Sequence, residues 1–340
     1  MREPAFWWRQ PGFASALLAP AAAIYGAVAS SRMMREGKRC SVPVICVGNF
    51  TLGGSGKTPA VVSIAKMLQD AGERVFCLSR GYGGSASGPK LVDAHADTAA
   101  AVGDETLLLA RVASTIVSRE RVSGAEFART QGATVVLMDD GLQNGSIKKD
   151  FTLAVVDGRR GLGCGKVFPA GPLRAPLAAQ WTRCDALLVV GEASGCGDVV
   201  AAAKMQGKSV FNARLVPEPA AVTALSGKHV LAFAGIGDPD KFFSTLVAAG
   251  VDAQRRAPFP DHHRFTTEEA AHLVMQADEA GLEIVTTEKD HARLMHDAGL
   301  AALCQRAHVL PVTLEFEKPE EIKALLVAAL SRRTARGTAA

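Results

Sequence analysis

Residues 47–59, with the sequence VGNFTLGGSGKTP, have the residue types and spacing of a phosphate-binding loop. A glycine-rich turn precedes Lys57 and Thr58, and an apolar run at 42–46 comes directly before it. When such a loop joins a strand to a helix, its backbone N–H groups bind phosphate oxygens. Its lysine binds the β- and γ-phosphates, and its threonine hydroxyl binds Mg²⁺. We expect the following residues to hold a nucleotide: Thr51, Leu52, Gly53, Gly54, Ser55, Gly56, Lys57 and Thr58.

The loop departs from the usual G-x-x-x-x-G-K-[ST] pattern, because Thr51 stands where the first glycine is usual. A turn opened by Gly53 and Gly54 would tolerate a hydroxyl there. The alternative is an ordinary glycine turn between a strand and a helix, but such turns seldom place Gly-Lys-Thr in this register. We interpret the stretch as a site for the phosphates of ATP.

A metal-binding pattern occurs in TVVLMDDGLQN at residues 134–144, where four apolar residues precede Asp139 and Asp140. An acid at the end of such a strand orients Mg²⁺ through its water shell. Two adjacent carboxylates are also costly unless a cation lies nearby. Because Asp and Gly favour turns, an acid pair at a strand-to-turn junction is the alternative. Given the phosphate loop, we predict a Mg²⁺ site.

Two further stretches contain groups suited to phosphoryl transfer. Arg80 lies in the glycine turn SRGYGG (79–84), where a flexible backbone would let it reach a phosphate. Asp104 and Glu105 begin an apolar helical pattern in VGDETLLLA (102–110). Phosphoryl transfer needs an acidic residue to orient the attacking group, but acids are also common at the start of helices. Asp104 could therefore act as the base in phosphoryl transfer or as the cap of this helix.

The stretch FPDHHRFT (259–266) combines a carboxylate with two histidines between an expected strand and helix. Asp261 could orient His262 and raise the basicity of its imidazole. Alternatively, the loop caps the next helix through Thr266 or Thr267 and leaves the histidines solvated. VTTEKDHARL (285–294) also ends a strand and begins a helix, so we expect its polar residues to face the same kind of crevice.

A parallel sheet must position these stretches, because short apolar runs alternate with helical patterns throughout residues 40–330. We expect strands at 42–48, 74–79, 134–138, 152–156, 185–190, 209–215, 229–234 and 283–286. We expect helices near 58–71, 104–114, 119–131, 239–249, 267–280 and 319–331. The predicted fold is α/β, with a P-loop NTPase-like parallel-sheet domain at 40–215, a smaller α/β domain at 216–332 and a flexible tail at 333–340.

Composition narrows the classes of partner. The 340 residues are 48% apolar and 21% charged, which indicates a folded globular protein with room for two domains. Residues 1–40 carry six basic and two acidic side chains, which accounts for the whole net charge of +4. This predicts a local contact with an anionic molecule or surface and no binding of nucleic acid.

The seven cysteines include no C-x-x-C pair, which favours reduced thiols and argues against a zinc site.

The N-terminal segment, residues 1–39, has the pattern of a membrane-associated helix. Residues 10–31 carry no charge and are long enough to cross a hydrocarbon core of about 30 Å. Alanines, glycines and two prolines make a poor span, whereas the flanking tryptophans and arginines suit a membrane interface. We predict a helix at the membrane surface, with a helix packed on its own domain and a single span as the alternatives.

Taken together, the motifs resemble those of a known family. VGNFTLGGSGKTP, SRGYGG, GDE, DDGLQ, FPAGPLR, FPDHHRF and TTEKD occur in this order after a basic, apolar N-terminus. The chain resembles the tetraacyldisaccharide 4′-kinase family of lipid A biosynthesis over about residues 5–330, and Thr51 is part of that family's own pattern. The resemblance implies transfer of the ATP γ-phosphate to the 4′-hydroxyl of an acylated disaccharide 1-phosphate at the cytoplasmic face of the bacterial inner membrane.

The resemblance also implies roles for individual residues. Asp104 becomes the base for the sugar hydroxyl, with His262 as its partner across the crevice, and Lys57 completes the catalytic set. The remaining roles are Mg²⁺ binding by Thr58, Asp139, Asp140 and Glu105, and phosphate or substrate contact by Arg80, Arg174 and Asp261. The implied partners are the acylated disaccharide 1-phosphate and the membrane lipid surface, with no obligate protein partner. The family commonly reads G-P-L-R-E where this chain has Ala175 after Arg174, so no metal or nucleotide role is carried over to that position.

Two other functions remain open on the sequence. A membrane-associated nucleotide switch or partitioning ATPase would share the phosphate loop, but it would not need the Asp104 and His262 stretches. The chain also lacks the N-K-x-D motif that reads guanine, which argues against a GTPase. A kinase for another lipid or sugar would differ only in its acceptor.

Overall fold

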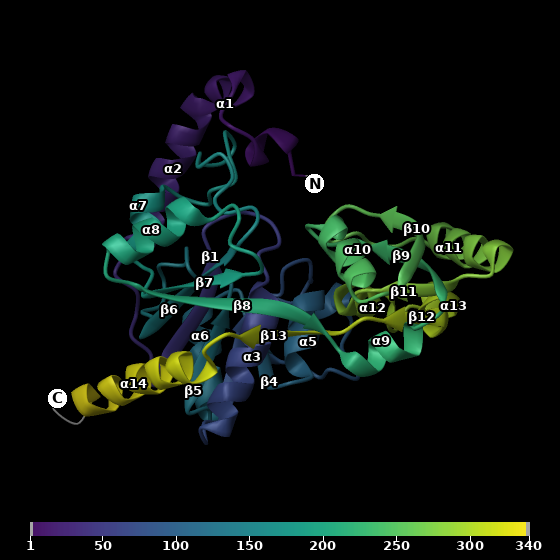
Figure 1. Ribbon diagram of the computed structural model, residues 1–340. Coiled ribbons are helices and arrows are strands. Elements are labelled where there is room, and N and C mark those ends of the chain that lie inside the picture. The colour runs from purple at the N-terminus through teal and green to yellow at the C-terminus, as the bar shows by residue number, and fades with distance from the viewer. Residues whose placement is uncertain (1–2, 338–340) are drawn as a thin grey trace.

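The computed structural model of the protein describes residues 3–337 and contains two α/β units, with the N-terminal helices projecting from the larger one (Figure 1). The larger unit is built on a nine-stranded sheet in the order β13-β8-β7-β6-β1-β5-β2-β4-β3. The strands from β8 to β4 in this order are parallel, and β13 and β3 pair antiparallel at the two edges. The strand bounds are β1 Val44–Asn49, β2 Val75–Ser79, β3 Lys90–Leu91, β4 Ser114–Val117, β5 Val135–Asp139, β6 Phe151–Asp157, β7 Ala186–Val190, β8 Ser209–Pro217 and β13 Val312–Phe316.

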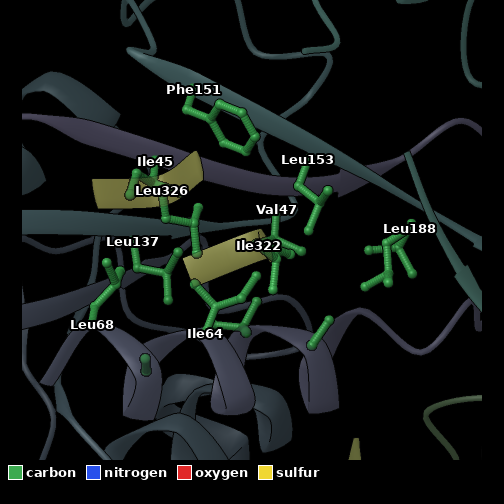
Figure 2. Close-up of a cluster of buried hydrophobic side chains, with 14 of the residues drawn as sticks. Ile45, Val47, Ile64, Leu68, Leu137, Phe151, Leu153, Leu188, Ile322 and Leu326 are labelled. Atoms are coloured by element: carbon green, nitrogen blue, oxygen red, sulfur yellow. The ribbon is translucent and has the colours of Figure 1, made fainter. Parts of the chain in front are cut away.

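Helices cover both faces of the large sheet, which is why its central strands are continuous apolar runs. Figure 2 shows one face, where Ile64 and Leu68 of one helix and Ile322 and Leu326 of another pack on the strands. Full burial of each such side chain stabilises the fold by roughly 1.5–3 kcal/mol. The helices are α3 Lys57–Asp70, α4 Ala99–Val102, α5 Asp104–Ala110, α6 Arg121–Thr130, α7 Leu177–Trp181, α8 Gly197–Met205 and α14 Pro319–Gly337.

The smaller unit has a four-stranded parallel sheet in the order β10-β9-β11-β12. Its apolar strands are packed between two clusters of side chains, one on each face. The strands are β9 His229–Ala234, β10 Asp252–Pro258, β11 Glu283–Thr286 and β12 Ala307–Val309. The helices are α9 Pro219–Leu225, α10 Pro239–Ala248, α11 Thr267–Ala280, α12 Glu288–Leu294 and α13 Ala301–Arg306. The predicted α/β class with a parallel sheet is confirmed.

The domain division differs from the expected one at the C-terminal end. We expected residues 216–332 to form the smaller domain, but β13 pairs with β8 and α14 packs against α3 in the large unit. Their apolar side chains complete the core of the large sheet, so the smaller unit is inserted between β8 and β13. The expected tail also differs, because α14 continues to Gly337 and Arg333 forms an ion pair with Asp150 at 2.6 Å. Residues 338–340 lie outside the described residues.

The N-terminal segment forms three short elements: a 3₁₀ turn η1 Ala5–Trp8, α1 Phe13–Leu17 and α2 Ala19–Met33. Pro20 lies in the first turn of α2, where proline is tolerated, so it helps to start that helix. Among the described residues, no helix combines the length and the apolar character needed to cross a membrane. Residues 1–2 of the expected membrane-associated segment lie outside the described residues.

Candidate active site

The phosphate loop follows β1, which has later strands of the chain on both sides. Such switch points in parallel sheets form ligand-binding crevices at the carboxyl ends of their strands. Gly56 caps the N-terminus of α3 with a left-handed φ of +86°, a conformation that glycine adopts without strain. Lys57 and Thr58 are therefore in the first helical turn, where free N–H groups and the helix dipole favour an anion.

The unusual Thr51 has a structural explanation. It forms an antiparallel bridge with Leu173, and its carbonyl accepts a hydrogen bond from Arg174 Nε at 2.8 Å. The neighbouring Leu52 N–H donates to the Pro172 carbonyl at 2.8 Å. Because the chain is bridged at this point, a β-branched residue suits it better than a glycine. The left-handed turns come later, at Gly53 and Gly56.

The two adjacent acids at the end of β5 are in opposite electrostatic states. Asp139 is 2% exposed and its Oδ1 has no hydrogen-bond partner. Burial, together with the charges of Glu105 and Asp140, raises the pKa of Asp139 to about 7. Both oxygens of Asp140 accept from Arg174 Nη1, at 2.9 and 2.8 Å, and Lys57 Nζ lies 3.8 Å away. Burial raises the pKa of Asp140, but Arg174 and Lys57 outweigh it and lower the value to about 2.

These environments distinguish the expected metal ligands. In the described part of the chain, no group of three or more His, Cys, Asp or Glu side chains could hold a metal ion alone. Mg²⁺ at phosphate sites usually takes one or two protein oxygens and completes its shell with phosphates and water. Asp139 fits that need because one of its oxygens is buried and unpartnered. By contrast, Asp140 is paired with Arg174, and Glu105 is paired with Lys289 at 2.6 Å.

Asp104 begins α5 after Gly103, whose φ is +89°. A side chain at residue 103 could not fit, since its Cβ would lie 2.6 Å from the Tyr82 carbonyl oxygen. The Oδ1 atom of Asp104 accepts from the Glu105 N–H at 2.9 Å, so the residue does contact the first turn of its helix. Its Oδ2 atom accepts from Arg293 and lies 3.4 Å from His262 Nδ1. Asp104 is the first residue of α5 and Gly103 is its N-cap, so Asp104 contacts the first turn without being the cap, and its role as a base stays a prediction.

His262 is oriented differently from the first expectation. Asp261 Oδ1 accepts from the backbone N–H of His262 at 3.0 Å, but its other oxygen is 3.8 Å from the imidazole Nε2. The nearest carboxylate to the ring is that of Asp104, and the ring of Tyr82 lies 4.9 Å away between centroids. Burial lowers the pKa of His262, but the carboxylates of Asp104 and Asp261 outweigh it and raise the value.

Two cationic side chains of the smaller domain form ion pairs with acids of α5. The sequence analysis did not name either of them as a site residue. Lys289 pairs with Glu105, and Arg293 pairs with Asp104. Burial opposes ionisation of both acids, but these cations, with His262 beside Asp104, hold their pKa values below the usual range. The sequence does contain a signal for them: in TTEKDHARL, Lys289 and Arg293 are four residues apart, which places both on one face of a helix.

A buried glutamine also escaped the sequence analysis. Gln180 on α7 is fully buried, and its Nε2 donates to the carbonyls of Phe50 at 3.1 Å and Ala175 at 2.8 Å. Its Oε1 accepts from Gln143 Nε2 at 2.7 Å. Gln180 therefore joins the entry of the phosphate loop, the segment after Arg174 and the loop after Asp140. No motif marked this position.

One cavity of about 1080 Å³ contains most of the expected site residues. His262 and Glu105 line it, whereas Asp104 is 4% exposed and does not. The cavity continues to Arg32 and Arg35 at the end of α2 and just beyond it. The other lining residues predicted from sequence are Leu52, Gly53, Gly54, Ser55, Gly56, Lys57, Thr58, Arg80, Asp139, Asp140, Arg174 and Asp261.

Comparison with known proteins identifies the arrangement. The sequence model of the family described as tetraacyldisaccharide-1-P 4′-kinase matches residues 14–331. The chain belongs to this family. The tetraacyldisaccharide 4′-kinase of Nitrobacter hamburgensis is 50% identical over 332 residues, which cover 98% of this chain and 99% of the relative. That of Rhodopseudomonas palustris is 50% identical over 327 residues, which cover 96% of each.

A solved structure of the family has the same fold. LpxK from Aquifex aeolicus, crystallised with ATP, superposes with a TM-score of 0.69 at 26% identity, covering 93% of this chain and 99% of that one. The resemblance inferred from the motifs is confirmed, and the chain is a kinase of the lipid A pathway. Ala175, to which no metal or nucleotide role was carried over, is fully buried, and its carbonyl accepts a hydrogen bond from Gln180 Nε2.

Proposed function

We propose that the chain transfers the γ-phosphate of ATP to the 4′-hydroxyl of a tetraacyl disaccharide 1-phosphate at the cytoplasmic surface of the inner membrane. One observation carries the proposal. A single cavity joins the phosphate loop, the imidazole of His262 and the basic residues at the end of the N-terminal helix. A plain nucleotide switch would need only the first of these.

The phosphate loop holds the nucleotide. Its backbone N–H groups and the N-terminus of α3 bind the phosphates, and Lys57 neutralises charge on the β- and γ-phosphates. Asp139 and Thr58 would hold Mg²⁺, which supplies further charge neutralisation on the phosphates when it is bound. Arg174, which is paired with Asp140, and Arg80 at the exposed turn both line the cavity and would contact phosphate or substrate.

The acceptor is prepared by the pair Asp104–His262. The imidazole lines the cavity, and the buried carboxylate lies next to its Nδ1 atom. We assign to this pair the removal of the proton from the 4′-hydroxyl. Because His262 lines the cavity and Asp104 does not, the imidazole accepts the proton, and Asp104 supplies the negative charge that makes the imidazole basic, instead of the direct role first expected for it. Loss of a general base usually costs about 10²–10⁴ in rate, so Asp104→Ala should lower kcat by that range.

The N-terminal helices supply the surface at which an acylated substrate is met. Phe13 is 84% exposed, Leu17 69%, Ile24 71% and Val28 46%, and all four lie on α1 and α2. Arg32 and Arg35 follow them and also line the cavity. Exposed apolar side chains followed by cations are typical of helices in the membrane interface. A substrate held by its acyl chains in the bilayer would therefore present its sugars to the cavity.

The decisive assay uses purified protein with ATP, Mg²⁺ and the tetraacyl disaccharide 1-phosphate in detergent. We expect a doubly phosphorylated lipid, and no product with Lys57→Ala. ATP hydrolysis without lipid phosphorylation would instead favour a nucleotide switch.

Membrane binding is tested separately by sedimentation with anionic vesicles. The triple variant Phe13→Gln/Leu17→Gln/Ile24→Gln should stay in the supernatant. The matched control Met205→Gln, which also removes a highly exposed apolar side chain, should sediment normally. If the triple variant still sediments, binding lies elsewhere.

A further inference from the structure

Arg293 connects the two domains at the proposed proton-accepting pair. We infer that Arg293 is a positioning residue, which fixes the carboxylate of Asp104 in the orientation that His262 requires. It acts from the smaller domain, because Arg293 lies on α12 and Asp104 on α5. The inference rests on the proposed function and deepens it by adding a residue that touches neither nucleotide nor acceptor.

The guanidinium is held on its own domain before it reaches Asp104. Its Nη1 donates to the Gly235 carbonyl and to Asp290 Oδ1, both at 2.7 Å. Asp290 is fully buried, and it is fixed in turn by the Gly235 N–H at 3.0 Å and the Thr287 hydroxyl at 2.6 Å. The side chain of Arg293 is only 7% exposed, so these contacts exclude solvent from the pair.

The other side of the guanidinium determines how the Asp104 carboxylate is oriented. Nε donates to Asp104 Oδ2 at 2.7 Å, and Nη2 donates to the same oxygen. The second carboxylate oxygen is held by the Glu105 N–H at 2.9 Å. With both oxygens fixed, Oδ2 stays 3.4 Å from His262 Nδ1. Apart from Arg293, the groups of the smaller domain that act on Asp104 are His262 at this oxygen and the more distant charge of Lys289.

The chemistry of the contacts explains why the residue is an arginine. Three acceptors surround one side chain: the Gly235 carbonyl, Asp290 Oδ1 and Asp104 Oδ2. A planar guanidinium offers five N–H donors in a fixed fork, whereas a lysine ammonium is a compact charge on a flexible stem. A lysine at this position would keep the charge but lose part of the orientation.

The test compares Arg293→Gln and Arg293→Lys with a control. The control is Lys241→Gln. It removes a different ion pair between the domains, Lys241 to Asp157 at 2.8 Å, at a residue that lines the same cavity but is paired with neither Asp104 nor His262. Steady-state kinetics with ATP and the lipid acceptor give kcat and KM, and direct titration gives the Kd for ATP. Each variant's melting temperature is recorded first.

For Arg293→Gln we expect kcat to fall by about 10²-fold, at the lower end of the effect of a general base, with the Kd for ATP and the KM values within about threefold of wild type. Arg293→Lys should recover about tenfold of that loss. Added guanidinium ion should partly restore Arg293→Gln and leave Lys241→Gln unchanged.

Three results would overturn the inference. They are a wild-type kcat in Arg293→Gln, a loss spread equally over kcat and both KM values, or no recovery by lysine or guanidinium. If Arg293→Gln does not fold, Arg293→Lys decides the question, since a wild-type kcat in that variant contradicts the need for the fork. Failure of the wild-type protein to phosphorylate the lipid would refute the proposed function itself, and this inference with it.

Discussion

Replacing Asp139 with asparagine should stabilise the ligand-free protein at alkaline pH, although the residue is proposed to serve catalysis. Its pKa is raised from 3.8 to about 7, mainly by burial. Each pKa unit corresponds to about 1.4 kcal/mol, so the ionised carboxylate costs roughly 4 kcal/mol at most, and about 2–4 kcal/mol once its surroundings relax. An asparagine of similar shape carries no charge and avoids this cost.

The sign of the pH dependence follows from proton binding. Between pH 3.8 and 7 the unfolded chain has lost the proton of Asp139 while the folded protein retains it, so stability falls as pH rises through this window. The advantage of Asp139→Asn should therefore be near zero at pH 4, grow toward pH 7 and remain constant above it. With Mg²⁺ and ATP bound, the wild-type protein should instead be the more stable of the two, since Mg²⁺ binds more tightly to a site that has the Asp139 carboxylate.

Thermal melting in EDTA without nucleotide tests this reasoning, and the adjacent acid supplies the control. A gain of about 2–4 kcal/mol should raise the melting temperature of the large domain by roughly 5–10 °C at pH 8. Asp140→Asn should lower it at pH 8, because the pKa of Asp140 is depressed to about 2 by Arg174 and Lys57. That loss, about 2 kcal/mol, disappears as pH falls from 3.8 toward 2. A lower melting temperature for Asp139→Asn at pH 8, or the same gain at pH 4 and pH 8, would refute the argument.

Three smaller predictions concern residues around the site. Gln180→Leu removes the side-chain donor of the buried Ala175 carbonyl and one of two donors of the Phe50 carbonyl, which keeps the Arg174 N–H, so we expect a loss of about 1–3 kcal/mol in urea denaturation. A loss under about 0.5 kcal/mol would contradict the hydrogen-bond argument. His291 has a pKa below 6.5 because it is buried, so stability should fall as pH drops below 6.5. In His291→Gln the melting temperature should change less between pH 7 and pH 5 than in the wild type. An unchanged dependence on pH would show that another group is responsible. Thr51→Gly should lower stability by about 0.5–1 kcal/mol and leave the Kd for ATP within a few-fold in a direct titration, whereas tighter binding would show that the threonine is a defect.

The parts of the site that sequence predicted are those encoded by adjacent residues. The apolar run of β1, the loop and the first turn of α3 are consecutive, so their chemistry can be recognised without any knowledge of distant contacts. Asp139 and Asp104 were found in the same way, as acids at the end of a strand and the start of a helix. Local pattern also predicted the parallel sheet, because each central strand is apolar on both faces.

The parts that sequence missed depend on pairing between distant segments. Lys289 and Arg293 are ordinary cations of a short helix until α12 is placed against α5. The sequence pattern extended the helix at 104 to residue 114, whereas α5 ends at Ala110 and Ser114 begins β4. That strand has four residues, too few to show a clear alternation.

The local sequence pattern also could not predict that the chain returns from the smaller domain to the large sheet as strand β13. Strand β13 is a five-residue segment whose burial alternates, and it could have bordered either sheet. Its pairing with β8 is decided by Leu314 and Phe316, which enter the core of the large sheet. Sequence spacing carries no information about which sheet has an open edge.

The insertion of the smaller domain between β8 and β13 has a consequence for biosynthesis. The core beside the phosphate loop needs Leu314, Ile322 and Leu326, which are synthesised only after the whole of the smaller unit. During synthesis the large domain therefore has an incomplete hydrophobic core at the stage when all strands of the smaller domain have already been made. We expect the inserted half to be the first to become protease-resistant on stalled nascent chains. ATP binding should appear only after the C-terminal helix has been released from the exit tunnel.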